Sequence, residues 1–406
     1  MKTEFNMIPR PGYLSQLMDF MDQNIIKVVT GIRRCGKSTL LDLFIEHLKK
    51  QGVNEKQIIF MNFESAEFEE ITDNHALYKY MKFRANRTGK TYIFLDEIQT
   101  VKNFEKAVNS FMIDFDADIY ISGSNASMLS SDLSTVLSGR YVEINMYPLS
   151  FKEYMSAQNP GKSPEDCFYD YMKYGGFPFL ADEKEERKIN SYLDGIYSSV
   201  VFKDIVQRNK IKDPVLIEKL IRFVFSSMGS LVSPASIAKT ISNNNRGISN
   251  ETIENYLEML CNAHVLSKAV RYDIKGKDYL KTLNKYYVTD LGLRNHLLGF
   301  RQTEPGRALE NIVYFELLQR GFNVDIGKVD NMEVDFVARN NNTIQYYQVA
   351  WTINNNPETL EREYRPFDAI PDHYEKSIIT TDKDFVNSIN GVKKINAIDF
   401  LLGAKP

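Results

Sequence analysis

Residues 25–38 read IIKVVTGIRRCGKS, and this stretch decides the fold of the first part of the chain. Its first half is a short, mostly β-branched run, which predicts a buried parallel strand. The second half has the spacing G-x-x-x-x-G-K-[ST], formed by Gly31, Gly36, Lys37 and Ser38. In this spacing backbone N–H groups surround a phosphate, the lysine reaches the terminal phosphates and the hydroxyl holds Mg²⁺. Residues 39–50 have the apolar spacing of a helix, so the stretch predicts a nucleoside triphosphate at a helix N-terminus.

Composition excludes several classes of protein. The 406 residues carry 50 Lys+Arg and 53 Asp+Glu, so no global basic field points to nucleic acid, and any DNA contact would have to be local. Cys35, Cys167 and Cys261 are too few and too scattered for a disulfide framework or a zinc site. No apolar run reaches about 18 residues, and the N-terminus lacks the apolar segment of a signal peptide. We therefore expect a cytoplasmic protein of two or three domains with no membrane partner.

Residues 91–99, TYIFLDEIQ, form a second motif in which an apolar strand ends at two carboxylates. In a P-loop NTPase the aspartate at this position supports Mg²⁺. The adjacent glutamate is suited to polarise a water for attack on the γ-phosphate. The alternative is the solvated start of a loop, but the phosphate-binding motif upstream favours the functional interpretation. We predict that Asp96 and Ser38 hold Mg²⁺ and that Glu97 is catalytic.

Three further positions could act on the same nucleotide. Residues 118–124, DIYISGS, predict a strand whose polar end could sense the γ-phosphate. Arg140, after Ser138 and Gly139, is a candidate arginine finger, because the transition-state charge calls for a planar cation. It could instead be a strand-start arginine that pairs with Glu143 or with a helix end. Arg10, in the leader, could approach the nucleotide or simply lie on the surface.

GIRRCGKST, LDEIQ, ISGSNASML and LSGR together resemble a widespread bacterial and archaeal AAA+ family, over essentially the whole chain. Its members join an ATPase core to a helical and winged-helix segment and a nuclease-like module. The resemblance implies catalysis by Glu97, a sensor at Asn125 and an arginine finger at Arg140, with Asp96 on Mg²⁺. It implies that ATP is contacted by Gly31, Arg34, Cys35, Gly36, Lys37, Ser38 and Thr39.

The expected architecture is α/β and has four parts. A P-loop AAA+ core, with a parallel sheet flanked by helices, is expected over residues 1–150, and a helical lid over 151–210. A winged helix is expected over 211–300. The last part, residues 301–406, is expected to be an α/β restriction-endonuclease-like domain of the PD-(D/E)XK type.

The winged-helix prediction rests on a helix, a polar turn, a helix with Ser249 as N-cap, and a hairpin. The second helix carries Glu251, Glu254 and Glu258, and carboxylates in a DNA groove are repelled. The hairpin carries basic residues: Arg271, Lys275, Lys277, Lys281 and Lys285. DNA contact through the hairpin and a purely structural winged helix both remain open.

In the C-terminal part, Glu310, Asp335 and Gln348 stand where the PD-(D/E)XK pattern places metal ligands, which makes a second Mg²⁺ site conceivable. The pattern expects Glu at Gln348 and Lys at Ala350. Glutamine offers a carbonyl but no charge, and alanine offers nothing to a water. Lys328 or Arg339 could replace the lysine, and a polar cluster that holds helix to sheet is the alternative. We predict that this module does not cleave DNA.

Three functions follow from these motifs. The first is an ATP-driven protein that binds or remodels DNA, including branched DNA, as a homo-oligomer that could close into a ring. It rests on Arg140, which a neighbouring subunit would supply, and on the nuclease-like module. The second is a STAND-like regulatory NTPase switch that binds a protein partner. The third is an active Mg²⁺-dependent DNA nuclease.

Overall fold

Contacts within the chain divide it into two compact units. The first unit comprises Met1–Pro148 with Asn262–His264, and the second comprises Leu149–Cys261 with Val265–Pro406. Ser138, named with Arg140 above, lies outside the described residues. The computed structural model describes residues 7–85, 89–126, 139–158, 161–242, 247–300, 304–341, 343–354, 357–383 and 388–403.

The first unit contains a five-stranded sheet in the order β2-β3-β4-β1-β5, and each paired neighbour is parallel. β1 and β3 are buried along their whole length, as expected for strands covered on both faces. The strands predicted at residues 25–30, 91–99 and 118–124 are each found to within a few residues. Their apolar runs are nearly continuous, which makes them recognisable in the sequence. The strands are β1 (Ile26–Thr30), β2 (Ile58–Asn62), β3 (Thr91–Asp96), β4 (Ala117–Gly123) and β5 (Tyr141–Asn145).

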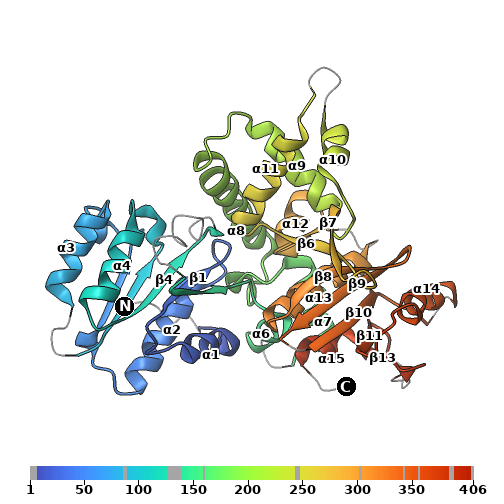
Figure 1. Ribbon diagram of the computed structural model, residues 1–406, viewed down its shortest axis with the longest axis horizontal. Coiled ribbons are helices and arrows are strands. Elements are labelled where there is room, and N and C mark those ends of the chain that lie inside the picture. The colour runs from blue at the N-terminus through green and yellow to red at the C-terminus, as the bar shows by residue number, and fades with distance from the viewer. Residues whose placement is uncertain are drawn as a thin grey trace. The chain divides into compact units, whose positions relative to one another are not determined.

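Helices cover both faces of this sheet (Figure 1). On one face, Ile93 and Ile119 belong to a core shared with α3 (Asn74–Arg84) and α4 (Phe104–Asp114). On the other face, the rings of Phe94 and Tyr120 pack against Phe44 of α2. The helices of that face are α1 (Pro11–Asp19) and α2 (Lys37–Lys50). The prediction of an α/β fold with a parallel sheet flanked by helices is confirmed.

The second unit begins with helices, which are followed by a two-stranded hairpin. Ser249 Oγ accepts from the Thr252 N–H at 3.1 Å, which confirms the predicted N-cap. A π-helical segment, Ser199–Gln207, continues α8. The helices are α6 (Phe151–Ser156), α7 (Pro164–Tyr174), α8 (Glu186–Ser198), α9 (Pro214–Ser226), α10 (Pro234–Ile241), α11 (Asn250–Asn262) and α12 (Leu291–Leu298).

The hairpin expected to be a wing belongs to a larger sheet. β6 (Leu266–Asp273) pairs with β7 (Asp278–Val288) on one side and, in parallel, with β8 (Asn323–Val329) on the other. The eight strands follow the order β12-β13-β11-β10-β9-β8-β6-β7. α13 (Pro305–Gln319) packs on this sheet (Figure 1). The remaining elements are β9 (Met332–Asn340), β10 (Thr343–Ala350), α14 (Pro357–Asp368), β11 (Glu375–Thr380), β12 (Ser388–Ile389), β13 (Val392–Asn396) and α15 (Ala397–Leu402).

The turn at residues 173–178, which read KYGGFP, is held by the buried carboxylate of Asp290. Asp290, the N-cap of α12, accepts from the Gly176 N–H at 2.7 Å and from the Leu293 N–H at 3.1 Å. A Cβ on Gly175 would come within 2.2 Å of Asp290 Oδ1, so this position needs glycine. Burial raises the pKa of Asp290 to about 6, although the backbone N–H groups favour its charged form.

Asp290 should make the stability of the second unit depend on pH. Between about pH 4 and pH 6 the Asp290 carboxyl keeps its proton in the native state and loses it in the unfolded state. The free energy of unfolding should therefore fall by roughly 2–3 kcal/mol as the pH rises through this range. Urea unfolding of the wild type and of Asp290→Asn at pH 4.5 and 7 measures this change, which the variant should lack. Asp368→Asn, at an exposed carboxylate, is the control. Equal pH dependence in the wild type and Asp290→Asn would contradict the expectation.

Candidate functional site

The phosphate-binding loop predicted from the sequence connects β1 to α2. Arg34 (φ 65°) and Gly36 (φ 107°) adopt left-handed conformations that turn the chain into the helix. Gly31 cannot be replaced without movement, because a Cβ there would come within 2.1 Å of the Met146 carbonyl oxygen. The first N–H groups of α2, a helix of 14 residues, have no partners within the helix. The loop therefore offers backbone donors to an anion.

Lys37 lies inside this loop and is 4% exposed. Its Nζ donates to the carbonyl oxygens of Gly31 at 3.0 Å and Ile32 at 3.3 Å. The same nitrogen lies 3.7 Å from Glu97 Oε1. The structure thus brings the loop lysine and the predicted catalytic glutamate together.

Asp96 ends β3 and is fully buried beside the loop. It is hydrogen-bonded by the hydroxyls of Ser38 and Ser122, and its Oδ2 accepts from Asn62 Nδ2 at 2.8 Å. Burial raises the pKa of Asp96, although the two hydroxyls favour its charged form. The Ser38 hydroxyl and the Asp96 carboxylate are adjacent hard oxygen ligands, which is the donor chemistry that Mg²⁺ prefers.

Glu97 follows Asp96 in a left-handed conformation (φ 54°) and is 8% exposed. Its N–H donates to Ser122 Oγ at 3.2 Å. Its Oε2 accepts a hydrogen bond from the Gln99 side-chain amide. Gln99 is a residue that the sequence did not single out, and it orients the carboxylate next to Lys37.

The two remaining predicted residues, Asn125 and Arg140, lie at opposite ends of the strands. Asn125 follows β4 at the edge where β1 and β3 also end, and it is 3% exposed. Arg140 lies before β5 and is exposed, and its carbonyl oxygen accepts from the N–H of Ile26 at the start of β1. The five residues of β1 span about 16 Å, so Arg140 is at the opposite end of the sheet from the loop of its own chain.

Arg10 is 3% exposed, so the expectation that it lies on the surface is wrong. Its guanidinium donates to the carbonyl oxygen of Cys35 in the loop at 3.2 Å, and to those of Tyr147 at 2.9 Å and Pro148 at 3.4 Å after β5. It also stacks over the ring of Tyr13. Arg10 therefore ties the loop to the end of a neighbouring strand. Burial raises the pKa of the Cys35 thiol, which is consistent with a passive loop position.

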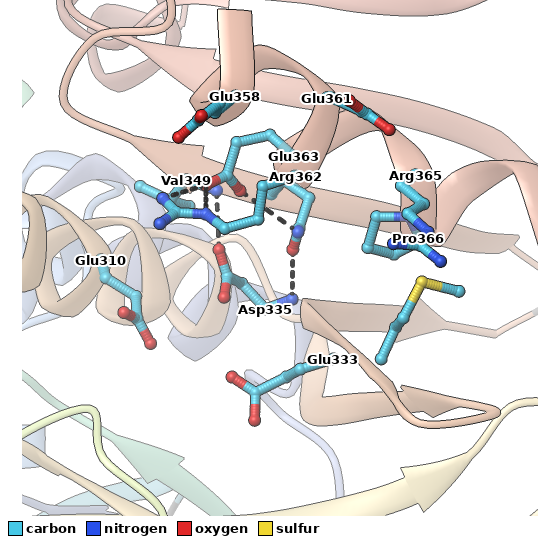
Figure 2. Close-up of a pocket in the computed structure, with 12 residues that line it drawn as sticks. Glu310, Glu333, Asp335, Val349, Glu358, Glu361, Arg362, Glu363, Arg365 and Pro366 are labelled. Carbon is cyan, nitrogen blue, oxygen red and sulfur yellow. Dashed lines mark hydrogen bonds and ion pairs between the residues drawn. The ribbon is translucent and has the colours of Figure 1, made fainter. Parts of the chain in front are cut away.

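A second cluster of titratable side chains lies in the second unit (Figure 2). Glu310 comes from α13, Glu333 and Asp335 come from β9, and Gln348 comes from β10. They line one side of a cavity of about 610 Å³. Its lining also includes Met332, Val349, Glu358, Glu361, Arg362, Glu363, Arg365 and Pro366.

Lys285 of β7 is the cation of this cluster. Its Nζ lies 2.8 Å from Glu310 Oε1, 2.8 Å from Glu333 Oε1 and 3.9 Å from Asp335 Oδ1. Burial alone would lower the pKa of Lys285, but the surrounding carboxylates raise it above its ordinary value. Burial, and then the nearby Glu310, hold the pKa of Asp335 well above its ordinary value.

This arrangement corrects two expectations about basic residues. Lys285 is 3% exposed, so it is not available as a DNA contact on the hairpin. Lys275, another hairpin lysine, pairs with Asp330 at 2.7 Å. Arg339 is paired with Asp325 and Lys328 lies 3.8 Å from Asp273, so neither takes the place of the absent lysine at position 350.

In the part of the chain that the structure covers, no group of three or more His, Cys, Asp or Glu side chains is arranged to hold a metal ion. Over the same residues, no helix is long and apolar enough to cross a membrane.

Family models match two regions of the chain. Residues 23–155 match an AAA domain, and residues 165–304 match a domain of unknown function (DUF8612). Among solved structures, a Walker-type ATPase of Pyrococcus abyssi is 14% identical, covers 72% of this chain and 96% of its own, and has a TM-score of 0.49.

Two curated relatives span nearly the whole chain. An uncharacterized protein of Haemophilus influenzae is 41% identical over 98% of this chain and 99% of its own length. An uncharacterized protein of Methanocaldococcus jannaschii is 32% identical over 90% of this chain and 81% of its own length. The chain therefore belongs to the same family as these two relatives, and its first unit contains an AAA domain with the fold of a P-loop ATPase.

Proposed function

We propose that this protein binds ATP with Mg²⁺ in the loop between β1 and α2 and hydrolyses it. The observation that carries the proposal is the convergence of Lys37, Asp96 and Glu97 at one edge of the sheet. Lys37 would neutralise the terminal phosphates, and Ser38 and Asp96 would hold Mg²⁺. The bound ion would neutralise charge on the β- and γ-phosphates. Glu97 would accept the proton of the attacking water, and Asn125 would contact the γ-phosphate.

Phosphate release from ATP, measured with and without Mg²⁺, tests this proposal. The wild type should turn over ATP only with the ion, and Lys37→Met should lose both binding of a fluorescent ATP analogue and turnover. A wild type that binds no nucleotide would contradict the proposal. Lys90→Met, which changes a partly exposed lysine at the other end of β3, is the matched control.

Arg10 should control the affinity of this site for ATP. Arg10→Met removes a charged donor from three carbonyl oxygens, which should loosen the loop and raise the KM for ATP about tenfold with a smaller change in kcat. Arg10→Lys should restore the affinity only in part, because an ammonium lacks the planar fork. Steady-state kinetics measure the split. Arg187→Met, at an exposed position in α8, should leave KM unchanged.

Arg140 supports an oligomeric form of the enzyme. Its distance from the loop of its own chain means that a finger role requires a neighbouring subunit. Arg140→Ala and Lys37→Ala should each be inactive alone. Mixed in equal amounts, they should regain about a quarter of the wild-type activity, because one interface in four then combines an intact loop with an intact Arg140. No recovery on mixing would contradict a finger supplied between subunits.

We further propose that ATP turnover is coupled to DNA binding or remodelling through the helix–turn–helix and the C-terminal part. The test is salt-dependent binding of linear, single-stranded and junction DNA, with stimulation of the ATPase as the second readout. Absence of binding at low salt would favour the second candidate, a nucleotide-dependent switch that binds a protein. The carboxylates of α11, the pairing of Lys275 and the burial of Lys285 favour that candidate.

A further inference from the structure

We propose that the ammonium group of Lys285 takes the place of a divalent metal ion in the C-terminal carboxylate cluster, which therefore binds no Mg²⁺. The cation is supplied by β7, a strand that precedes the cluster's other residues by at least 22 positions and shares their sheet. It lies within hydrogen-bonding distance of two carboxylates, Glu310 and Glu333, and near a third, Asp335. Glu310 and Asp335 are also the two acidic groups expected from the sequence to hold a metal in this place.

The oxygen atoms expected to bind a metal already have partners. Gln348 has one side-chain oxygen, and it accepts from the Asp335 N–H at 2.6 Å. Its amide nitrogen donates to Glu363 Oε2 at 3.3 Å, which fixes the orientation of the side chain. Asp335 Oδ2 accepts from the Val349 N–H at 2.8 Å. A metal ligated by the Gln348 oxygen would have to share that oxygen with the Asp335 N–H.

The carboxylate of Glu310 also has hydrogen-bond partners already. Its Oε1 accepts from Lys285 Nζ at 2.8 Å and from the Tyr287 hydroxyl at 2.7 Å. Tyr287 is fully buried, and its ring stacks on Tyr314 of α13, so this hydroxyl has no freedom to swing away. The helix that carries Glu310 is thereby attached to β7 through one carboxylate.

A metal ion would also compete with the ammonium electrostatically. Mg²⁺ needs near-octahedral oxygen ligands at 2.0–2.1 Å, so an ion on Glu310 and Asp335 would lie within a few ångströms of Lys285 Nζ. The two cations would repel each other in a poorly solvated site. Lys285 is 3% exposed and belongs to a strand paired on the β6 side, so it cannot withdraw into solvent.

The Lys285 nitrogen is directed at carboxylates and is held by them, so its place in the cluster is that of a counter-ion. Removal of this one charge should therefore create a metal site that the natural protein lacks. The carboxylates, freed from the ammonium, would have the negative charge that attracts a divalent cation.

The test is Mn²⁺ binding to the full-length, nucleotide-free protein, measured by the loss of the free-ion electron paramagnetic resonance signal. Wild type and Glu310→Gln should retain the same amount of Mn²⁺, because the cluster contributes none. Lys285→Met should retain one additional Mn²⁺ per chain, and Lys285→Met/Glu310→Gln should lose it again. Lys285→Arg, which keeps a cation, should behave as the wild type.

Two outcomes would overturn the proposal. The first is a Mn²⁺ ion bound by the wild type and lost in Glu310→Gln. The second is a folded Lys285→Met protein, verified by circular dichroism, that gains no Mn²⁺. If Lys285→Met does not fold, the comparison of wild type with Glu310→Gln still decides. A melting temperature of Lys285→Met that rises with added Mn²⁺, while that of the wild type does not, would be the supporting result in a thermal assay.

Discussion

Glu97→Gln should lower the kcat of ATP hydrolysis by about 10²–10⁴-fold and leave ATP bound at least as tightly as in the wild type. Glutamine has the shape of glutamate, so its side-chain oxygen can still accept from the Gln99 amide and its backbone N–H can still donate to Ser122 Oγ. It cannot, however, take a proton from water. Loss of the carboxylate 3.7 Å from Lys37 also removes a competitor of the phosphates for that ammonium. Single-turnover hydrolysis and binding of a fluorescent ATP analogue separate the two effects.

The control for this variant is Glu55→Gln, which changes a carboxylate that is 80% exposed and distant in sequence from the loop. Its kcat and nucleotide affinity should equal those of the wild type. If Glu97→Gln kept most of its activity, another residue would have to activate the water. If it lost nucleotide binding instead, Glu97 would be needed for the shape of the loop rather than for the chemical step.

Lys285→Met should reduce the free energy of unfolding of the second unit by about 3–5 kcal/mol. The change leaves the carboxylates of Glu310, Glu333 and Asp335 close together with no cation between them. Urea or thermal unfolding measures the loss. Adding Glu310→Gln to Lys285→Met should recover part of it, so the two changes should be less than additive in a double-mutant cycle.

Lys275→Met is the matched control, because Lys275 lies on the same hairpin and also pairs with a carboxylate, that of Asp330. Its ion pair is about half exposed on both sides, so its loss should cost no more than about 1 kcal/mol. Equal losses in Lys275→Met and Lys285→Met would mean that burial does not strengthen the Lys285 cluster.

The sequence singles out the residues that meet at the proposed nucleotide site because most of them lie close together in the chain. The loop, β1 and α2 follow one another within 26 residues, and the spacing of Gly31 and Lys37 carries the geometry with it. Asp96 and Glu97 come from a different strand, but an apolar run ending in two carboxylates is itself a recognisable pattern. Parallel strands then place both motifs at one edge of the sheet.

The sequence does not predict Arg10, Gln99 or the partners of Lys285, because their roles depend on segments far apart in the chain. Arg10 contacts carbonyl oxygens 25 and 137 positions away, and no side-chain pattern records a bond to a backbone oxygen. Lys285 lies in a hairpin with several other basic residues, which is also the pattern of an exposed basic surface. Its enclosure depends on the pairing of β6 with β8, which joins the hairpin to the C-terminal strands, and on the contacts with Glu310 and Glu333.

That pairing also determines how the chain can be divided. A chain that stopped near residue 300 would keep β6 and β7 but lose β8, and would leave β6 with an unpaired edge at Arg271–Asp273. Unpaired edges recruit strands from other molecules, so such a fragment should aggregate. The fragment would also lose Glu310, Glu333 and Asp335 and keep Lys285 without them. The hairpin and the C-terminal strands should therefore fold together, as parts of one sheet in one compact unit.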